Sequence, residues 1–330
     1  MRICLFDHSK VSHFGLMAGG SGIFDELFNG LNDIGIDANY IINEESNIHH
    51  EYSDKIIPLS EEEINNLISG ISKVSRYFKG DIFHSMNSGK HTNFDLGGFG
   101  GRWIATCHGA DAEDAAAEFL VFVGKDQMYR HCSIFDSHSR SKRIYVAYNC
   151  FQPGLKHIAG KHNDVIHLSA IRPDKGVHLL PYIAETIQRE IHLYGSISNP
   201  EYFDKKVLPY VGHSIIYHGP IESLEQKNKM FSTAEVFLHP AVFPEPFGIT
   251  LIESMICGIP FTGFEIGSLP ELKPTGAVLA KDIDELCRIL MNKLYLHDEL
   301  KLISHASKFS CENMVHNYIR IYRDVLAYPY

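Results

Sequence analysis

The chain of 330 residues has no long hydrophobic run, no paired cysteines and no excess of positive charge. No apolar run approaches the roughly 18 residues that a membrane-spanning helix needs. The first residues, with Asp7 close behind, lack the apolar core of a signal peptide. The seven cysteines form no C-x-x-C pair, a pattern typical of reduced thiols. We therefore expect a soluble, cytoplasmic protein.

Positive charge is scarce, because 30 lysines and arginines stand against 40 aspartates and glutamates, giving a formal net charge of −10. This balance argues against a general nucleic-acid binder and against strong association with an anionic membrane through a basic face. The 20 histidines form no ligand spacing with nearby acids or cysteines. We therefore predict no metal site and no cofactor. The oligomeric state is not specified by the sequence.

Length and pattern predict two domains, since 330 residues exceed one ordinary core and short apolar runs alternate with helical stretches through most of the chain. Repeated strand–helix units need a parallel sheet covered on both faces. The predicted fold is α/β, with two Rossmann-like, doubly wound domains facing across a cleft. We expect the first domain at 1–155, the second at 156–310, and a helix at 311–330 that crosses back to the first domain.

The first domain offers two candidate ligand positions. A glycine turn that includes Gly19 and Gly20 precedes a predicted helix starting at Ile23, where bare N–H groups could meet an anion. His108 follows the apolar run 103–107, at the expected carboxyl end of a strand. The alternatives are plain turn geometry for the glycines and an ordinary hydrogen-bonded histidine at a strand end.

The richest stretch is 239–271, which begins after the predicted strand 236–238, passes through a proline-stiffened loop and enters a predicted helix at 249–256. Glu245 lies in the loop and Glu253 one to two turns into the helix. Ligands of open α/β sheets bind outside the carboxyl ends of the strands. Both carboxylates would flank such a crevice. Alternatively, Glu253 caps its helix with Thr250, and Glu245 is an exposed loop acid.

These residues resemble the E-x7-E signature of family-4 retaining glycosyltransferases, which have the GT-B fold. The match comprises Glu245-Pro-Phe-Gly, Glu253 eight positions later, Gly258-Ile-Pro and Gly267-Ser-Leu-Pro-Glu. Shorter matches extend across most of the chain: Gly19-Gly20 in the glycine loop, Asp81-Ile-Phe-His84, Thr106-Cys-His108-Gly109, Asn149 in the linker and Pro173-Asp-Lys175-Gly176 in the phosphate-binding segment.

The resemblance implies an enzyme that moves a sugar from a nucleoside diphosphate sugar to an acceptor hydroxyl of a glycan or small molecule, without a metal. Glu245, Lys175 and His108 would be catalytic, with Lys175 neutralising the departing diphosphate. Glu253 would accept hydrogen bonds from the ribose hydroxyls. The resemblance implies further donor contacts from Phe247, Gly248, Ile249, Arg172, Gly19 and Gly20.

One position departs from the family pattern, because the arginine expected five residues before Lys175 is Ala170. Arg172 lies two positions later. A missing charge-assisted contact of this kind costs about 1.5–3 kcal/mol. The alternatives are therefore a relative that binds nucleotide sugars without catalysis, as a sensor or partner subunit, and a sugar-nucleotide epimerase on the same fold.

Overall fold

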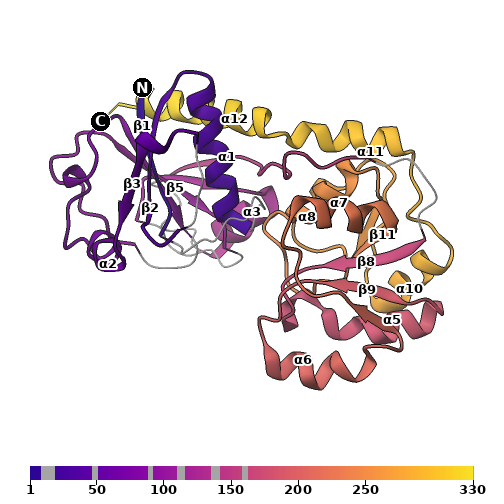
Figure 1. Ribbon diagram of the computed structural model, residues 1–330. Coiled ribbons are helices and arrows are strands. Elements are labelled where there is room, and N and C mark those ends of the chain that lie inside the picture. Colours follow the sequence, from indigo (N-terminus) through magenta and orange to yellow (C-terminus); the bar gives the residue numbers. More distant parts are fainter. Residues whose placement is uncertain are drawn as a thin grey trace. The chain divides into compact units, whose positions relative to one another are not determined.

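The computed structural model describes residues 1–8, 19–46, 51–87, 92–109, 116–134, 142–157 and 163–329. The chain divides into two compact units, one made of residues 1–150 and 310–330 and the other of residues 151–309 (Figure 1). The sequence placed the corresponding limits at 155 and 310. Each unit is an α/β domain built on one parallel sheet, so the predicted fold class of two Rossmann-like domains is confirmed.

The first unit contains a seven-stranded sheet in the order β3-β2-β1-β4-β5-β6-β7, in which every neighbouring pair is parallel. Its strands are β1 (Arg2–Phe6), β2 (Asp37–Asn43), β3 (Ile56–Leu59), β4 (Ile82–Asn87), β5 (Arg102–Cys107), β6 (Phe119–Phe122) and β7 (Arg143–Val146). Its α-helices are α1 (Gly19–Asp33), α2 (Glu61–Ile68), α3 (Lys125–Ile134) and α12 (Cys311–Ala327). β1, β5 and β6 are buried almost throughout, as parallel strands covered on both faces must be.

The last helix, α12, belongs to the first unit, where it packs against α1 (Figure 1). A buried polar chain joins it to the sheet: His84 Nδ1 lies 2.7 Å from Tyr322 Oη and Nε2 lies 2.7 Å from Thr106 Oγ1. Thr106 Oγ1 is in turn 3.1 Å from Tyr318 Oη. Burial lowers the pKa of His84 to about 3, so the ring is neutral and both nitrogens are satisfied.

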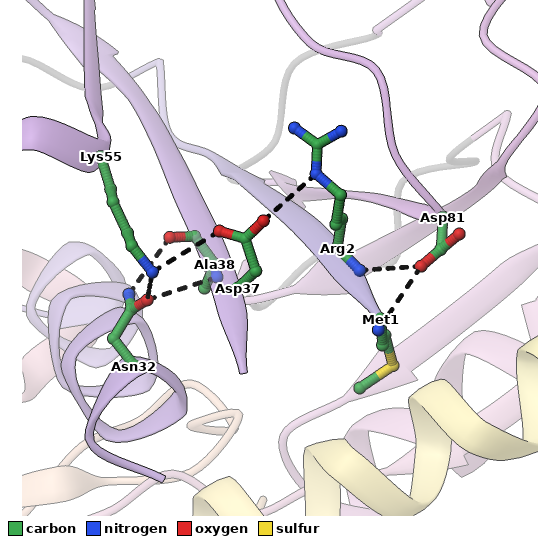
Figure 2. A network of polar contacts seen from close by, with 7 residues as sticks. All are labelled: Met1, Arg2, Asn32, Asp37, Ala38, Lys55 and Asp81. Carbon is green, nitrogen blue, oxygen red and sulfur yellow. Dashed lines mark hydrogen bonds and ion pairs between the residues drawn. The ribbon is translucent and has the colours of Figure 1, made fainter. Parts of the chain in front are cut away.

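A polar network closes the amino edge of this sheet (Figure 2). The Arg2 amide donates to Asp81 Oδ2 at 2.7 Å, and Arg2 Nε donates to Asp37 Oδ2 at 3.2 Å. Lys55 Nζ donates to Asn32 Oδ1 at 2.6 Å and lies 3.5 Å from Asp37 Oδ1. These contacts connect residues at the starts of β1, β2, β3 and β4 with one another and with α1.

The second unit contains a five-stranded parallel sheet in the order β10-β9-β8-β11-β12. Its strands are β8 (Asp164–Leu168), β9 (Ile191–Tyr194), β10 (Ile215–Tyr217), β11 (Ala234–His239) and β12 (Phe261–Gly263). Its α-helices are α5 (Leu180–Ile187), α6 (Pro200–Lys206), α7 (Leu224–Thr233), α8 (Ile249–Ile256), α9 (Leu269–Leu272), α10 (Ile283–Met291) and α11 (Glu299–Ala306). Because β8 and β11 are adjacent and parallel, the loops that follow them leave the same edge of the sheet.

The structure corrects several expected elements. The helix after the first strand begins at Gly19 rather than Ile23, so Gly19 and Gly20 form its first turn. The helical spacing of apolar residues over 60–77 and the pairing of Ser60 with Glu63 predict a capped helix there. The helix observed, α2, is shorter and ends at Ile68, and the capping box is present. β3 and α3 were not predicted. Pro58 interrupts the strand signal, which an edge strand tolerates because one side of its backbone is unpaired.

Candidate active site

Lys175 lies in a tight turn after β8. Pro173–Lys175 form one turn of 3-10 helix, which ends at Gly176 with φ 69°, in the left-handed region. A Cβ on Gly176 would lie 1.8 Å from the carbonyl oxygen of Pro240, so only glycine fits between this turn and the loop after β11. The Val242 amide donates to the Asp174 carbonyl at 3.0 Å, which joins the two loops a second time.

Glu245 is held by the turn before α9. Its carbonyl oxygen accepts from the Ser268 amide at 3.0 Å. A Cβ on Gly267, where φ is 58°, would lie 2.6 Å from the Glu245 nitrogen. These backbone contacts explain why the glycine turn accompanies the acidic loop in the sequence: close backbone approach positions the carboxylate.

The two loops bring Lys175 and Glu245 together as an ion pair between Lys175 Nζ and Glu245 Oε1. Their side chains are 16% and 14% exposed, so the pair is mostly shielded but still reached by solvent. The two residues are 70 positions apart in sequence, but Lys175 follows β8 and Glu245 follows β11, which are adjacent parallel strands. The pair places a cation and a hydrogen-bond acceptor at one point of the carboxyl edge.

Two buried histidines lie beside this pair. The rings of His167, on β8, and His239, the last residue of β11, have centroids 6.4 Å apart. His167 is satisfied by the Leu238 carbonyl at 2.8 Å and Ser169 Oγ at 2.7 Å. Burial lowers the pKa of each imidazole to about 3. Neither histidine was singled out from the sequence, since a histidine within a strand is no signal by itself.

Glu253 lies in α8 with no exposed surface. Its Oε1 accepts from Lys227 Nζ of α7 at 2.7 Å, and Lys227 is itself only 5% exposed. Oε2 is buried and has no hydrogen-bond partner among the described residues. The alternative that Glu253 caps its helix with Thr250 is wrong, because the N-cap residue is Gly248 and no side chain caps there. The sequence did not identify Lys227.

Three residues predicted to contact the donor lie at the start of α8. Gly248 has φ 84° and precedes Ile249, the first helical residue. Phe247 is 2% exposed, and its carbonyl accepts from Ser268 Oγ at 2.6 Å. N–H groups in the first turn of a helix have no intrahelical acceptor and favour anions. Phe247, Gly248 and Ile249 thus lie at the start of α8, next to the loop that holds Glu245.

Arg172 forms its ion pair with Asp174 and has no ion pair with Glu245 among the described residues. Its side chain is 48% exposed and Nε lies 2.9 Å from Asp174 Oδ1, an ion pair within its own turn. Ala170 precedes it at the end of β8. Of the two cations predicted for the donor site, Lys175 therefore contacts Glu245, whereas Arg172 contacts Asp174.

His108 belongs to the first unit and follows β5. Its Nε2 is buried without a hydrogen-bond partner among the described residues, and burial lowers the pKa of its ring to about 4. Gln127 of α3 donates through Nε2 to the carbonyls of Cys107 at 3.0 Å and Gly109 at 2.7 Å. Gln127, 1% exposed, therefore positions the turn that carries His108. The sequence did not point to it.

Within the described ranges, no group of three or more His, Cys, Asp or Glu residues is arranged to hold a metal ion. None of the helices in the same ranges has the length and apolar character needed to cross a bilayer. His13, His49 and His50 lie outside these ranges.

Residues 162–294, most of the second unit, match the family described as Glycosyl transferases group 1. An uncharacterized glycosyltransferase of Methanocaldococcus jannaschii is 24% identical over 202 residues. That alignment covers 51% of this chain and 51% of the relative, so the chain spans about half the length of the curated relative it matches. The second unit is therefore similar to the glycosyltransferases of group 1.

Solved structures resemble the whole chain. AviGT4, a glycosyltransferase involved in avilamycin A biosynthesis, has a TM-score of 0.73 at 18% identity, covering 99% of this chain and 98% of its own. Sucrose-phosphate synthase of Thermosynechococcus elongatus has a TM-score of 0.74 at 17% identity, covering 99% of each chain. HepE of Anabaena, solved with UDP and glucose, has a TM-score of 0.72 at 15% identity, covering 98% of this chain and 100% of its own. The fold is that of GT-B glycosyltransferases, and these findings together support the prediction of a glycosyltransferase.

Proposed function

We propose that this protein is a retaining, metal-independent glycosyltransferase that moves a sugar from a nucleoside diphosphate sugar to an acceptor hydroxyl. The observation that carries the proposal is the ion pair of Lys175 and Glu245 at the carboxyl edge of the second sheet. It supplies both charges that the reaction needs, a cation for the leaving diphosphate and an acceptor for a hydroxyl of the transferred sugar. The match to group 1 glycosyltransferases lies in the same unit.

Each residue has a physical role in this proposal. Lys175 neutralises the negative charge that grows on the diphosphate as its bond to the sugar breaks, which lowers the barrier of an oxocarbenium-like transition state. Glu245 orients the sugar by accepting a hydrogen bond from one of its hydroxyls. Glu253 has a spare oxygen, Oε2, for the ribose of the donor. Phe247, Gly248 and Ile249 offer N–H groups at the start of α8.

The stereochemical part of the proposal is attack on the same face of the sugar that the diphosphate leaves. The acceptor oxygen bonds to the anomeric carbon, the bond to the diphosphate breaks, and the acceptor's proton passes to the departing phosphate oxygen. No protein nucleophile is needed, and charge stabilisation by Lys175 replaces that of a metal ion. His108, whose Nε2 has no partner in the described part of the chain, would contact the sugar from the first unit.

The test uses the purified chain and a panel of UDP-, ADP- and GDP-sugars. Thermal shift identifies the donor, because a ligand at 100 times its Kd stabilises by about 2.7 kcal/mol. Product NMR then reports the anomeric configuration, and added EDTA tests the requirement for metal. We expect retained configuration and unchanged turnover in EDTA. Inversion or loss of turnover in EDTA would contradict the respective part of the proposal.

Lys175→Met provides the residue-level test, and Lys205→Met is its matched control. Lys205 also pairs with a glutamate, Glu201, at 2.6 Å, but both side chains are exposed on α6. We expect Lys175→Met to lower turnover by about 100-fold or more and Lys205→Met to leave it unchanged. Donor binding without transfer to any acceptor would instead identify a nucleotide-sugar-binding relative, the alternative that Ala170 favours.

A further inference from the structure

His239 is a buried histidine whose ring has no hydrogen bond. It is 3% exposed, and neither Nδ1 nor Nε2 has a partner among the described residues. Buried polar side chains are nearly always hydrogen-bonded, so an orphaned ring needs an explanation. Its neighbour His167 shows that the surroundings can satisfy a histidine, since both of its nitrogens are bonded.

The nearest partner for His239 is already engaged by another residue. Nε2 of His239 lies 3.7 Å from Glu245 Oε1, the same oxygen that Lys175 Nζ contacts. That distance is too long for a hydrogen bond, but an approach of about 0.8 Å would make one. His239 therefore stands beside a carboxylate oxygen that Lys175 occupies.

We propose that His239 is the standby hydrogen-bond partner of Glu245, taking over its carboxylate when Lys175 turns to the diphosphate of the donor. The inference rests on the proposed function and adds a positioning residue to it. One ammonium group has to serve two anions, because Lys175 holds Glu245 before the donor arrives and must neutralise the diphosphate afterwards. Without a replacement, a shielded carboxylate would lose its partner at the moment it has to orient the sugar.

The electrostatics around the ring agree with this exchange. The charged and titratable groups that face His239 are Lys175 on the turn after β8, Glu245 on the loop after β11, and His167 on β8. Burial, and then the positive charge of Lys175, lower the pKa of His239 to about 3. The ring is thus neutral while the ion pair is intact. When Lys175 moves away, its positive charge no longer lowers the pKa of His239. The negative charge of the Glu245 carboxylate then raises that pKa.

A ligand-free experiment imitates that departure. In Lys175→Met the cation is missing, so His239 should bond to Glu245 and its titration should move up by at least two pH units relative to the unsubstituted chain. Imidazole nitrogen NMR follows this, with the His239 resonances assigned by difference from His239→Gln. Adding Glu245→Gln should abolish the shift. A ring that titrates alike with and without Lys175 would overturn the proposal. Lys175→Gln provides a second variant should Lys175→Met fail to fold.

A binding experiment then connects the exchange to the donor, with UDP-glucose and uridine as probes. We expect His239→Leu to weaken UDP-glucose binding by about tenfold, and His239→Gln, which keeps a donor, by less than threefold. Uridine has no diphosphate, so its affinity should not change. Equal weakening of both probes would show general disruption and would overturn the positioning role. Failure of UDP-glucose to bind the unsubstituted chain would count against UDP-glucose as donor, while the ligand-free titration still decides the role of His239.

Discussion

His84 in the first unit and His239 in the second are both buried on inner strands of parallel sheets, and burial lowers the pKa of each ring to about 3. Their hydrogen bonding is opposite. His84 is bonded through both nitrogens, to Tyr322 and Thr106. Neither nitrogen of His239 has a hydrogen-bond partner among the residues that the structure describes, and a carboxylate oxygen lies 3.7 Å from its Nε2.

The difference separates a structural histidine from one available for function. His84 ties α12 to the sheet, so its bonds are used up by the folded state. The ring of His239 has no hydrogen-bond partner among the described residues, which costs free energy in the folded state. Such a cost is tolerated where the missing hydrogen bond forms in the ligand-bound state. Burial and pKa are alike in the two residues, so neither property distinguishes them. The inventory of hydrogen-bond partners does.

The largest effect should come from Glu245, the residue that gives His239 its proposed role. Glu245→Gln removes the charge that holds Lys175 and orients the sugar, and we expect turnover to fall by 100- to 1,000-fold, about 3–4 kcal/mol. Glu201→Gln, on the exposed face of α6, is the matched control and should have no effect. Initial rates with the donor identified by thermal shift provide the measurement. A fully active Glu245→Gln enzyme would show that Glu245 is not needed for turnover, and would contradict a functional role for His239.

Substitution of His84 should lower the free energy of unfolding more than substitution of His239. His84→Phe leaves the hydroxyl of Tyr322 buried without its partner and leaves Thr106 with Tyr318 alone, which should cost about 2–3 kcal/mol. Urea unfolding followed by fluorescence reports this directly, because Trp103 is the single tryptophan and lies in the first unit.

His239→Leu removes an unsatisfied ring and should change the stability of the second unit by less than about 1 kcal/mol. Amide hydrogen exchange along β11 measures it. Equal destabilisation by the two substitutions would show that hydrogen-bond satisfaction does not distinguish these histidines.

Gly176→Ala should act on the second unit alone. The left-handed φ of 69° and the 1.8 Å approach to the Pro240 carbonyl force the turn to shift. We expect a loss of about 2 kcal/mol in stability, together with lower turnover because Lys175 is displaced. Gly212→Ala is a matched control, since φ there is 84° but a Cβ meets nothing within 4 Å. If both variants lose the same stability, backbone strain rather than loop contact explains the effect.

The last expected effect is a change in acid sensitivity. His84 and His108 have pKa values lowered to about 3 and about 4, so the unfolded state binds protons below about pH 6.5 that the folded first unit does not. Stability of this unit is therefore present above that pH and falls as pH drops, by about 1.4 kcal/mol per pH unit per histidine. His84→Phe should halve the slope reported by Trp103, and His239→Leu should leave it unchanged. An unaltered slope in His84→Phe would contradict the lowered pKa.

Local pattern was sufficient wherever a feature depends on neighbouring residues. The helix over 249–256 was predicted with its observed bounds, because a glycine on each side marks its ends and its apolar positions recur at helical spacing. The loop that presents Glu245 and the capping box of Ser60 were predicted for the same reason. The sequence pattern does not predict β3, because Pro58 interrupts the strand signal. α1 starts earlier than predicted, because glycines are more typical of a loop than of a helix.

Local sequence pattern does not predict which residues far apart in the chain contact each other. Lys227 meets Glu253 across 26 residues, Lys175 meets Glu245 across 70, and His84 meets Tyr322 across 238. The site residues Glu245, Lys175 and Glu253 were nevertheless named, because their motif resembles that of a known family. Lys227, His239 and Gln127 have no such motif and became visible only through their contacts.

The sequence by itself determined the class of fold, the alternation of strands and helices, and the positions where loops leave the carboxyl edge, because these depend on short-range periodicity and turn chemistry. Only the tertiary structure decided which side chains meet there. Adjacent strands come from separate parts of the chain, so a hydrogen-bond partner is set by sheet order rather than by sequence distance. For that reason a satisfied His84 and an unsatisfied His239 look the same in the sequence and differ in the folded protein.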